Sequence, residues 1–212
     1  RNGTEGRFLP RLTLDASWPL INSVGNWTQL VEPLVSIVVA KNGGNPETIP
    51  NEDSRSFDLD DSNLFSADRF SGLDRWEGGI RATYGAKWSL QGSGIQTEFL
   101  IGQSLRFDAD AARFPEGTGL GGNFSDIVGR AAVNVLQQFE IGYRFRLDKE
   151  SLDVRRNEVD LSLNGKNYNV TAGYVRLNRN LQINDLENRE EIRLTGLYRI
   201  NENWSVTGGT IQ

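Results

Sequence analysis

Histidine, cysteine and methionine are all missing from this chain of 212 residues. Without His or Cys, the sequence excludes a Ser-His-Asp triad, a cysteine nucleophile and a zinc site that uses either residue type. Disulfide bonds within the chain are excluded as well. The chain starts at Arg1, with neither an initiator methionine nor a signal peptide, so we expect it to be a processed or excised piece of a longer protein.

Long apolar runs and blocks of basic residues are also missing. No stretch reaches the roughly 18 consecutive apolar residues of a transmembrane helix, and the mean hydropathy is −0.47. The net charge of −5 and the lack of a basic block argue against a nucleic-acid partner. A negative mean hydropathy does not exclude a membrane, because a transmembrane β-strand alternates apolar and polar residues.

Alternation of apolar and polar residues with period two dominates the sequence. From 76 to 90 the even positions are mostly Trp, Tyr, Ile, Ala and Leu, whereas the odd positions hold Glu, Arg, Thr, Lys, Ser and Gly. Residues 139–147 and 192–200 repeat the pattern. Successive side chains of a strand point to opposite faces of a sheet, so each stretch predicts a strand with one apolar face and one polar face.

This template predicts an all-β, antiparallel chain. About ten strands are expected near residues 6–18, 27–40, 75–90, 95–107, 125–136, 138–148, 152–164, 167–177, 189–200 and 203–212. Most exceed the roughly five or six residues of a soluble strand and match the roughly 9–11 residues that cross a bilayer. The predicted fold is therefore a transmembrane β-barrel segment, about ten strands of a larger outer-membrane barrel.

The expected connections alternate between short and long. Short turns are predicted near 21–26, 91–94, 137, 164–167 and 201–203, and long loops near 41–74, 108–124 and 177–188. Outer-membrane barrels have short periplasmic turns and long extracellular loops, so the long connections are expected to face outward. The connection at 148–151 is short where a long loop is due, and a change of phase between Val154 and Val159 indicates a bulge.

Two prolines fall inside expected strands. Pro10 and Pro33 each remove a ladder hydrogen bond. They indicate a bulge or a strand end. The functional alternative is a seam, a place where the pairing between two neighbouring strands is locally weakened.

Charges of both signs occupy the predicted polar faces, as expected for the wall of a water-filled lumen. The lumen-facing charges expected on the strands are Glu32, Glu98, Arg106, Arg130, Glu140, Arg144, Arg146, Arg193 and Arg199. Lumen arginines would attract phosphate, although a generic solvated wall would hold the same mixture. A soluble antiparallel sheet with one solvated face is the alternative, which strand length and the aromatic residues near strand ends disfavour.

The long connection at about 41–74, here called the signature loop, has an unusual composition. The run from Asp58 to Asn63 faintly resembles a calcium loop, but Asn63 and Arg69 stand where an EF-hand needs Gly and Glu. We instead expect its acidic side chains to cap turns and to pair with Arg69 and Arg75. Aromatic and aliphatic residues spaced through the loop would let it fold inward over a barrel mouth.

Two motifs in this region resemble the signature of a known family. They are IPNEDS, from Ile49, and a second motif of the form LFxxxRFSGxDRxEGGxRxxYG, from Leu64. The site residues of the loop and adjoining strand are Asn51, Glu52, Asp53, Ser54, Asn63, Leu64, Phe65, Arg69, Phe70, Ser71, Gly72, Asp74, Arg75, Glu77, Gly79, Arg81, Tyr84 and Gly85. Together they resemble the LPS-assembly outer-membrane protein family, LptD, also called OstA or Imp.

The resemblance implies a place and a task for the chain. Residues 1–212 would be a partial C-terminal outer-membrane β-barrel domain of LptD type, with the signature loop extracellular and the N-terminal periplasmic domain absent. The family assembles lipopolysaccharide (LPS) into the outer leaflet of the Gram-negative outer membrane. It makes and breaks no covalent bond, so the resemblance implies a translocon rather than an enzyme, with no catalytic residue, metal or cofactor.

The resemblance also implies partners. They are LPS as the transported substrate, a plug lipoprotein (LptE-like) in the lumen, a periplasmic LPS bridge protein (LptA-like) and the lipids of the outer membrane. A porin or receptor-type channel is the alternative function, and it would explain the strands but not the signature. A soluble β-sandwich or carbohydrate-binding module, and a hydrolase using Asp60 with Glu77, are further alternatives.

Overall fold

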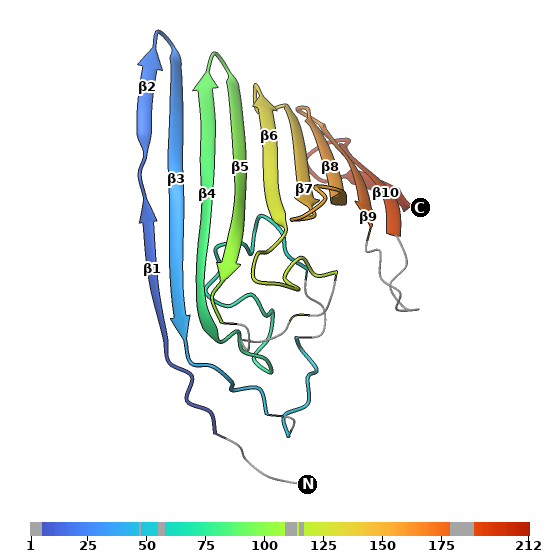
Figure 1. Ribbon diagram of the computed structural model, residues 1–212. Coiled ribbons are helices and arrows are strands. Elements are labelled where there is room, and N and C mark those ends of the chain that lie inside the picture. Colours follow the sequence, from blue (N-terminus) through green and yellow to red (C-terminus); the bar gives the residue numbers. More distant parts are fainter. Residues whose placement is uncertain (1–5, 47, 55–57, 109–113, 115–116, 179–188) are drawn as a thin grey trace.

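Eleven β-strands form one antiparallel sheet in the computed structural model, which describes residues 6–46, 48–54, 58–108, 114, 117–178 and 189–212 (Figure 1). The strands are β1 (Arg11–Ser17), β2 (Leu20–Val24), β3 (Trp27–Ala40), β4 (Gly79–Gly92), β5 (Ile95–Arg106), β6 (Ile127–Val135), β7 (Phe139–Leu147), β8 (Val154–Asn164), β9 (Tyr168–Leu177), β10 (Arg189–Arg199) and β11 (Ser205–Ile211). The all-β, antiparallel prediction is confirmed.

Among the described residues, no helix has the length and apolar character needed to cross a membrane. The strand order runs from β1 and β2, which both pair with β3, to β11. Within the described part of the chain the sheet is not closed, so β11 and the β1–β2 strand are its two edges. This open sheet is consistent with a segment of a barrel.

The first edge is interrupted opposite a proline. β1 and β2 pair with successive parts of β3, and the chain leaves the ladder at Trp18 and Pro19. Pro33 of β3 lies opposite this gap, and its carbonyl oxygen accepts a hydrogen bond of 3.1 Å from the Trp18 backbone N–H. Because proline offers no N–H to a neighbouring strand, the interruption lies where the ladder bond is missing.

Three regions differ most from the prediction. The strand expected at 6–18 begins only at Arg11, after Pro10. The turn expected at 21–26 was too long, because Leu20–Val24 is itself a strand and only two residues separate β2 from β3. β4 begins at Gly79 rather than at 75, so Glu77 precedes the strand. The predicted bulge is confirmed, because Arg146 pairs with Arg156 while Leu147 pairs with Val154.

Tight turns and long connections lie at opposite ends of the sheet (Figure 1). β4 and β5 are joined by Ser93 and Gly94, which both have positive φ, 49° and 79°. Such a two-residue turn matches the twist of the strands that it joins. The expected alternation is therefore confirmed where the chain is described, apart from the short β7–β8 connection that the sequence already marked as an exception. Most of the loop expected at 177–188 lies outside the described residues.

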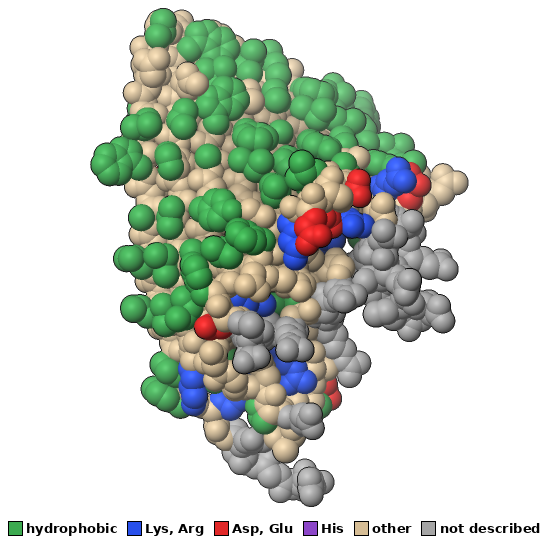
Figure 2. Space-filling model, viewed as in Figure 1, with side chains coloured by type: hydrophobic (Ala, Val, Ile, Leu, Met, Phe, Trp, Pro, Cys, Tyr) green, Lys and Arg blue, Asp and Glu red, His purple; other side chains and the backbone are tan. Residues whose placement is uncertain are grey.

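The two faces of the sheet differ in chemistry. One face is apolar and exposed, and Figure 2 shows its hydrophobic side chains spread over the strands, with Lys, Arg, Asp and Glu gathered toward the loop end. Leu14, Ile192 and Val206 on different strands are 64%, 55% and 60% exposed. The other face carries charged side chains in register, for example Arg130 beside Arg144, and the signature loop packs against it.

Candidate functional site

A reciprocal clasp joins the two motifs of the signature loop. The Asp53 carboxylate accepts hydrogen bonds from the backbone N–H groups of Leu73 (2.7 Å) and Asp74 (3.1 Å). The Asp74 carboxylate accepts in return from the backbone N–H groups of Glu52 (2.8 Å) and Asp53 (3.1 Å). The Leu73 N–H is the main cause that lowers the pKa of Asp53 to about 2, because it stabilises the charged carboxylate.

Neighbouring motif residues shape this clasp. A Cβ atom on Gly72 would overlap the Asp53 carboxyl group, so the close approach requires glycine. The Asn51 side chain exchanges two hydrogen bonds with the backbone of Ser54, and Ser71 Oγ donates to the Asp53 carbonyl at 3.1 Å. Together these contacts hold the two motifs side by side in the folded loop.

A buried carboxylate, Glu77, ties the loop to β4 and β5. It is 0% exposed and forms ion pairs with Arg69, with Arg81 at 3.0 Å and with Arg106 at 3.1 Å. Burial alone would raise the pKa of Glu77, but the three guanidinium groups outweigh it and hold the pKa below its usual range. The Phe114 ring lies 5.3 Å from the Arg106 guanidinium carbon and closes the cluster with a cation–π contact.

A second ionic cluster surrounds Arg146 of β7. Its buried guanidinium pairs with Asp58 of the signature loop and, at 3.4 Å, with Asp126. It also donates to the carbonyl oxygens of Gly117 (2.9 Å) and Thr118 (3.1 Å) in the connection after β5. Burial is the main cause that raises the pKa of Asp126, against the effect of Arg146. The two long connections are thus held together on one strand residue.

An apolar core fills the space between these two clusters. It comprises Leu59, Leu64, Phe114, Leu120 and Val128, with Phe65 and Phe70 packed against it. Phe70 stacks on Phe114 with ring centroids 4.6 Å apart. Burying such side chains stabilises a fold by about 1.5–3 kcal/mol each, so the loop is held by packing as well as by charge.

Two facing strand glycines let the loop approach the sheet. Gly85 and Gly102 are directly opposite in β4 and β5. A Cβ atom on Gly102 would lie 2.6 Å from Leu64 Cδ2, and one on Gly85 would lie 3.1 Å from Phe65 Cζ. Because both positions lack a side chain, Leu64 and Phe65 can pack directly against β4 and β5. The loop therefore packs on the charged face of the sheet.

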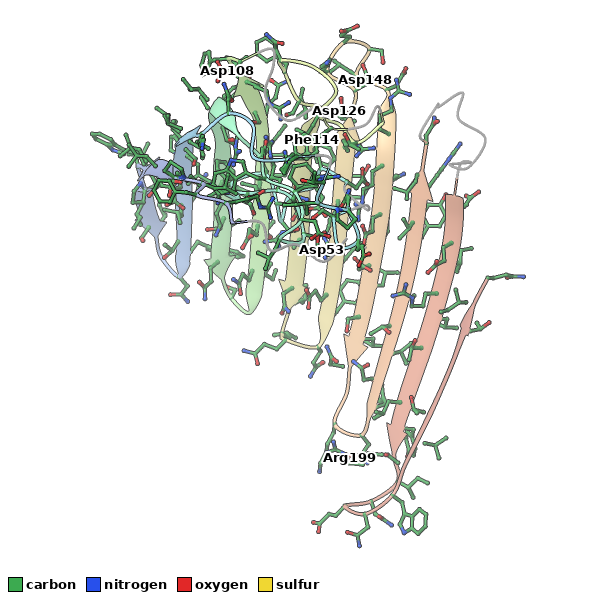
Figure 3. The ribbon with its side chains drawn as sticks, turned by 90° about the horizontal axis from the view of Figure 1, so that it is seen from below. Asp53, Asp108, Phe114, Asp126, Asp148 and Arg199 are labelled. Atoms are coloured by element: carbon green, nitrogen blue, oxygen red, sulfur yellow. The ribbon has the colours of Figure 1, made fainter. Side chains whose placement is uncertain are left out.

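The predicted site residues are mostly, but not all, brought together. Figure 3 shows Asp53 and Phe114 within the cluster of loops and Arg199 at the far end of the sheet. Tyr84 projects on the apolar face, where its hydroxyl contacts Gln103 Oε1 at 2.6 Å. Glu32 and Arg193 lie on strands away from the clusters. Arg75 donates a hydrogen bond of 3.2 Å to the Ile49 carbonyl oxygen and so links two parts of the signature loop.

The expected partners of the acidic run were wrong, although the expected capping is confirmed. Asp60 caps a turn by accepting hydrogen bonds from the backbone N–H groups of Ser62 (2.9 Å) and Asn63 (3.2 Å). Arg69 pairs with Glu77 rather than with this run, and Asp58 pairs with Arg146. Long-range contacts decide these pairings, and local spacing does not encode them.

The two carboxylates of the hydrolase alternative, Asp60 and Glu77, have separate partners in this geometry. Asp60 accepts hydrogen bonds within its own turn, whereas Glu77 is enclosed by three guanidinium groups. In the described part of the chain, no group of His, Cys, Asp and Glu is arranged to hold a metal ion.

Several contributing residues were missed by sequence reasoning. Asp61, Asp126 and Arg156 carry the charge network, and Phe114 and Leu120 carry the core. Their one signal in the sequence is the density of opposite charges in two long connections and on the strands between them. That signal indicates pairing but does not identify partners.

The comparison with known families decides the identity. Residues 1–204 match the family model described as LptD, LPS transport system D. The chain belongs to the LptD family. A search of curated proteins finds no match. Membership of the LptD family places the chain in LPS transport and assembly at the outer membrane, and LPS is the molecule that this transport family handles.

Proposed function

We propose that this chain is part of the wall of an integral outer-membrane β-barrel that delivers LPS to the outer leaflet. The signature loop would enter the lumen from the extracellular side and fill part of it. The chain would then act as a translocon component rather than as an enzyme. The observation that carries the proposal is the exposed apolar face, which spans strands from β1 to β11.

Physical reasons connect this face to a bilayer. Soluble monomers rarely expose an apolar patch larger than a few hundred Å², whereas lipid-facing strands alternate apolar-out and polar-in. The charged face would contact water and the sugars of LPS. A soluble β-sandwich would need a second layer over the apolar face, and the described residues provide none.

The partners that we propose follow from the family. A plug lipoprotein (LptE-like) would occupy some of the lumen that the signature loop leaves open. A periplasmic bridge protein (LptA-like) would deliver LPS to the complete protein. No cofactor is required, because transport changes no covalent bond.

Ion current through the complete protein tests the plugged lumen and separates it from a porin. The complex with its plug lipoprotein should show little steady current in a planar bilayer. Deleting Asn51 to Leu73 should open a stable conductance and make cells leaky to large antibiotics, while heat-modifiable migration on gels checks that the barrel still folds. A large steady current before the deletion would favour a passive channel and contradict the proposal.

A further inference from the structure

Two groups of arginines near the charged face differ sharply in exposure. One group has side chains that are at most 11% exposed and are fixed in the two ionic clusters; it comprises Arg69, Arg81, Arg106 and Arg146. In the other group, the side chains of Arg130, Arg144 and Arg193 are 38%, 40% and 60% exposed. Because the guanidinium groups of the second group reach water, they can exchange partners at a lower cost than the buried arginines can.

These three exposed arginines line one hollow of about 450 Å³ on the charged face of β5 to β10. Its volume lies within the roughly 300–1,000 Å³ of small-ligand sites. Gly142 and Gly173 leave space in its floor, and the other hydrogen-bonding side chains of its lining are Gln96, Glu98, Asn134, Glu140, Asp160, Ser162 and Thr171. Such a lining suits a polar, hydroxyl-rich ligand with a charged group.

Two of these arginines are incompletely paired with the loop. Asp61 lies 3.9 Å from Arg130 Nε and 3.8 Å from Arg144 Nε, beyond the roughly 3.2 Å of a hydrogen bond. Among the described residues, Arg130 Nε has no hydrogen-bond acceptor. Burial and the neighbouring Asp60 raise the pKa of Asp61, so its charge is poorly stabilised there. Asp61 is thus a weak partner for two strong donors.

The backbone around Asp61 is nevertheless fixed. Leu59 and Leu64, on either side, are both 0% exposed in the apolar core. A ligand would therefore replace the Asp61 side chain at the arginines without lifting the loop from the sheet. Replacement of a side chain costs far less than opening a packed core.

Building on the proposed function, we propose that this hollow is a transient binding site for a phosphate-bearing sugar unit of LPS. Arg130 and Arg144 would donate charge-assisted hydrogen bonds to the phosphate, and Asp61 is the built-in anion that the phosphate displaces. Glu98 also pairs with Arg130, and Glu158 (2.8 Å) and Asp160 (3.6 Å) also pair with Arg144; these carboxylates keep the affinity low. Low affinity suits transit, because a ligand in a passage must leave as readily as it enters.

Photocrosslinking in cells tests this site in the complete protein. A photoreactive residue replaces Thr171, which lines the hollow, or Thr207, which is in β11 outside it. Each reporter is combined with Arg130→Gln plus Arg144→Gln, with Asp61→Asn, or with Glu32→Gln as a matched carboxylate control on β3. The readout is the yield of LPS crosslinked at each reporter.

The double arginine variant should lower the Thr171 yield about fivefold relative to Thr207, a change equivalent to about 1 kcal/mol. Asp61→Asn should raise the Thr171 yield, and Glu32→Gln should leave it unchanged. Purified LPS from which the phosphate groups have been removed should crosslink poorly to the wild-type protein. Its yield should be no higher than that of intact LPS with the double arginine variant. If Thr207 crosslinks LPS but Thr171 responds to none of these changes, the site is wrong and the translocon stands. If neither reporter crosslinks LPS, the proposed function itself is contradicted.

Discussion

Two carboxylates, Asp53 and Glu77, anchor the signature loop in different ways. Glu77 is enclosed by three guanidinium groups away from water. Asp53 is exposed and gains its stabilisation from backbone N–H groups held in fixed positions. The first depends on charge balance in a buried cluster, and the second depends on loop geometry. Each type of anchor predicts a different experimental signature.

Glu77→Gln should destabilise the folded protein by about 3–5 kcal/mol, because it leaves buried guanidinium groups without a counter-charge. Glu140→Gln on the same face is the matched control and should cost below about 1 kcal/mol, since Glu140 is exposed. Urea unfolding of the complete protein in micelles measures both. Equal effects of the two substitutions would mean that the cluster does not hold the loop.

Acid should release the clasp only at very low pH. The folded pKa of Asp53, about 2, lies below its ordinary value of 3.8, so its stabilisation is complete above 3.8 and is lost as the pH falls through 2. Pepsin should therefore cleave the wild-type signature loop more slowly at pH 3.5 than at pH 1.5. Asp53→Asn should be cleaved readily at both values. A wild-type loop cleaved equally at both pH values would contradict the clasp.

Residue-level prediction from the sequence succeeded for the motif and failed for its partners. The motif residues gather because the clasp links neighbouring parts of one loop, from Asp53 to Asp74. The partner of Asp58 is 88 positions away at Arg146, and many arginines would satisfy the same charge. Only the folded sheet decides among them.

At the scale of elements, strand periodicity predicted most of the sheet. The period-two pattern holds wherever one face is apolar, so β3 and β5 were placed within one residue of their observed ends. β2 was missed because its five residues follow Pro19 directly, and the proline interrupts the alternation of apolar and polar residues. The start of β4 was placed early because Trp76 and Glu77 continue the alternation into the loop.

Strand glycines provide an element-level test of loop docking. Gly102→Ala should destabilise the protein by about 1–3 kcal/mol, because the new methyl group would lie 2.6 Å from Leu64 Cδ2. Gly142→Ala in β7 is the matched control, since its nearest neighbour would be 3.9 Å away. Urea midpoints compare the two. If the Gly102→Ala protein were as stable as the Gly142→Ala protein, Leu64 of the loop would not pack against Gly102.

At the scale of the whole molecule, the arrangement is a sheet with an apolar exposed face and a charged face that carries the signature loop. The sequence predicted both faces, because alternation encodes them locally. It did not predict that two long connections share one core, because Leu59 and Val128 are brought together only by the curved sheet and the loops folded over it. The open hollow beside that core follows from the same packing.

Delivery of LPS to the outer leaflet by the complete protein can be measured in cells. The most direct measurement is the fraction of newly made, pulse-labelled LPS that reaches the cell surface after the complete protein is depleted. The fraction should fall as the protein is lost and should recover with a wild-type copy. An undiminished fraction of labelled LPS at the surface of depleted cells would contradict the proposed function.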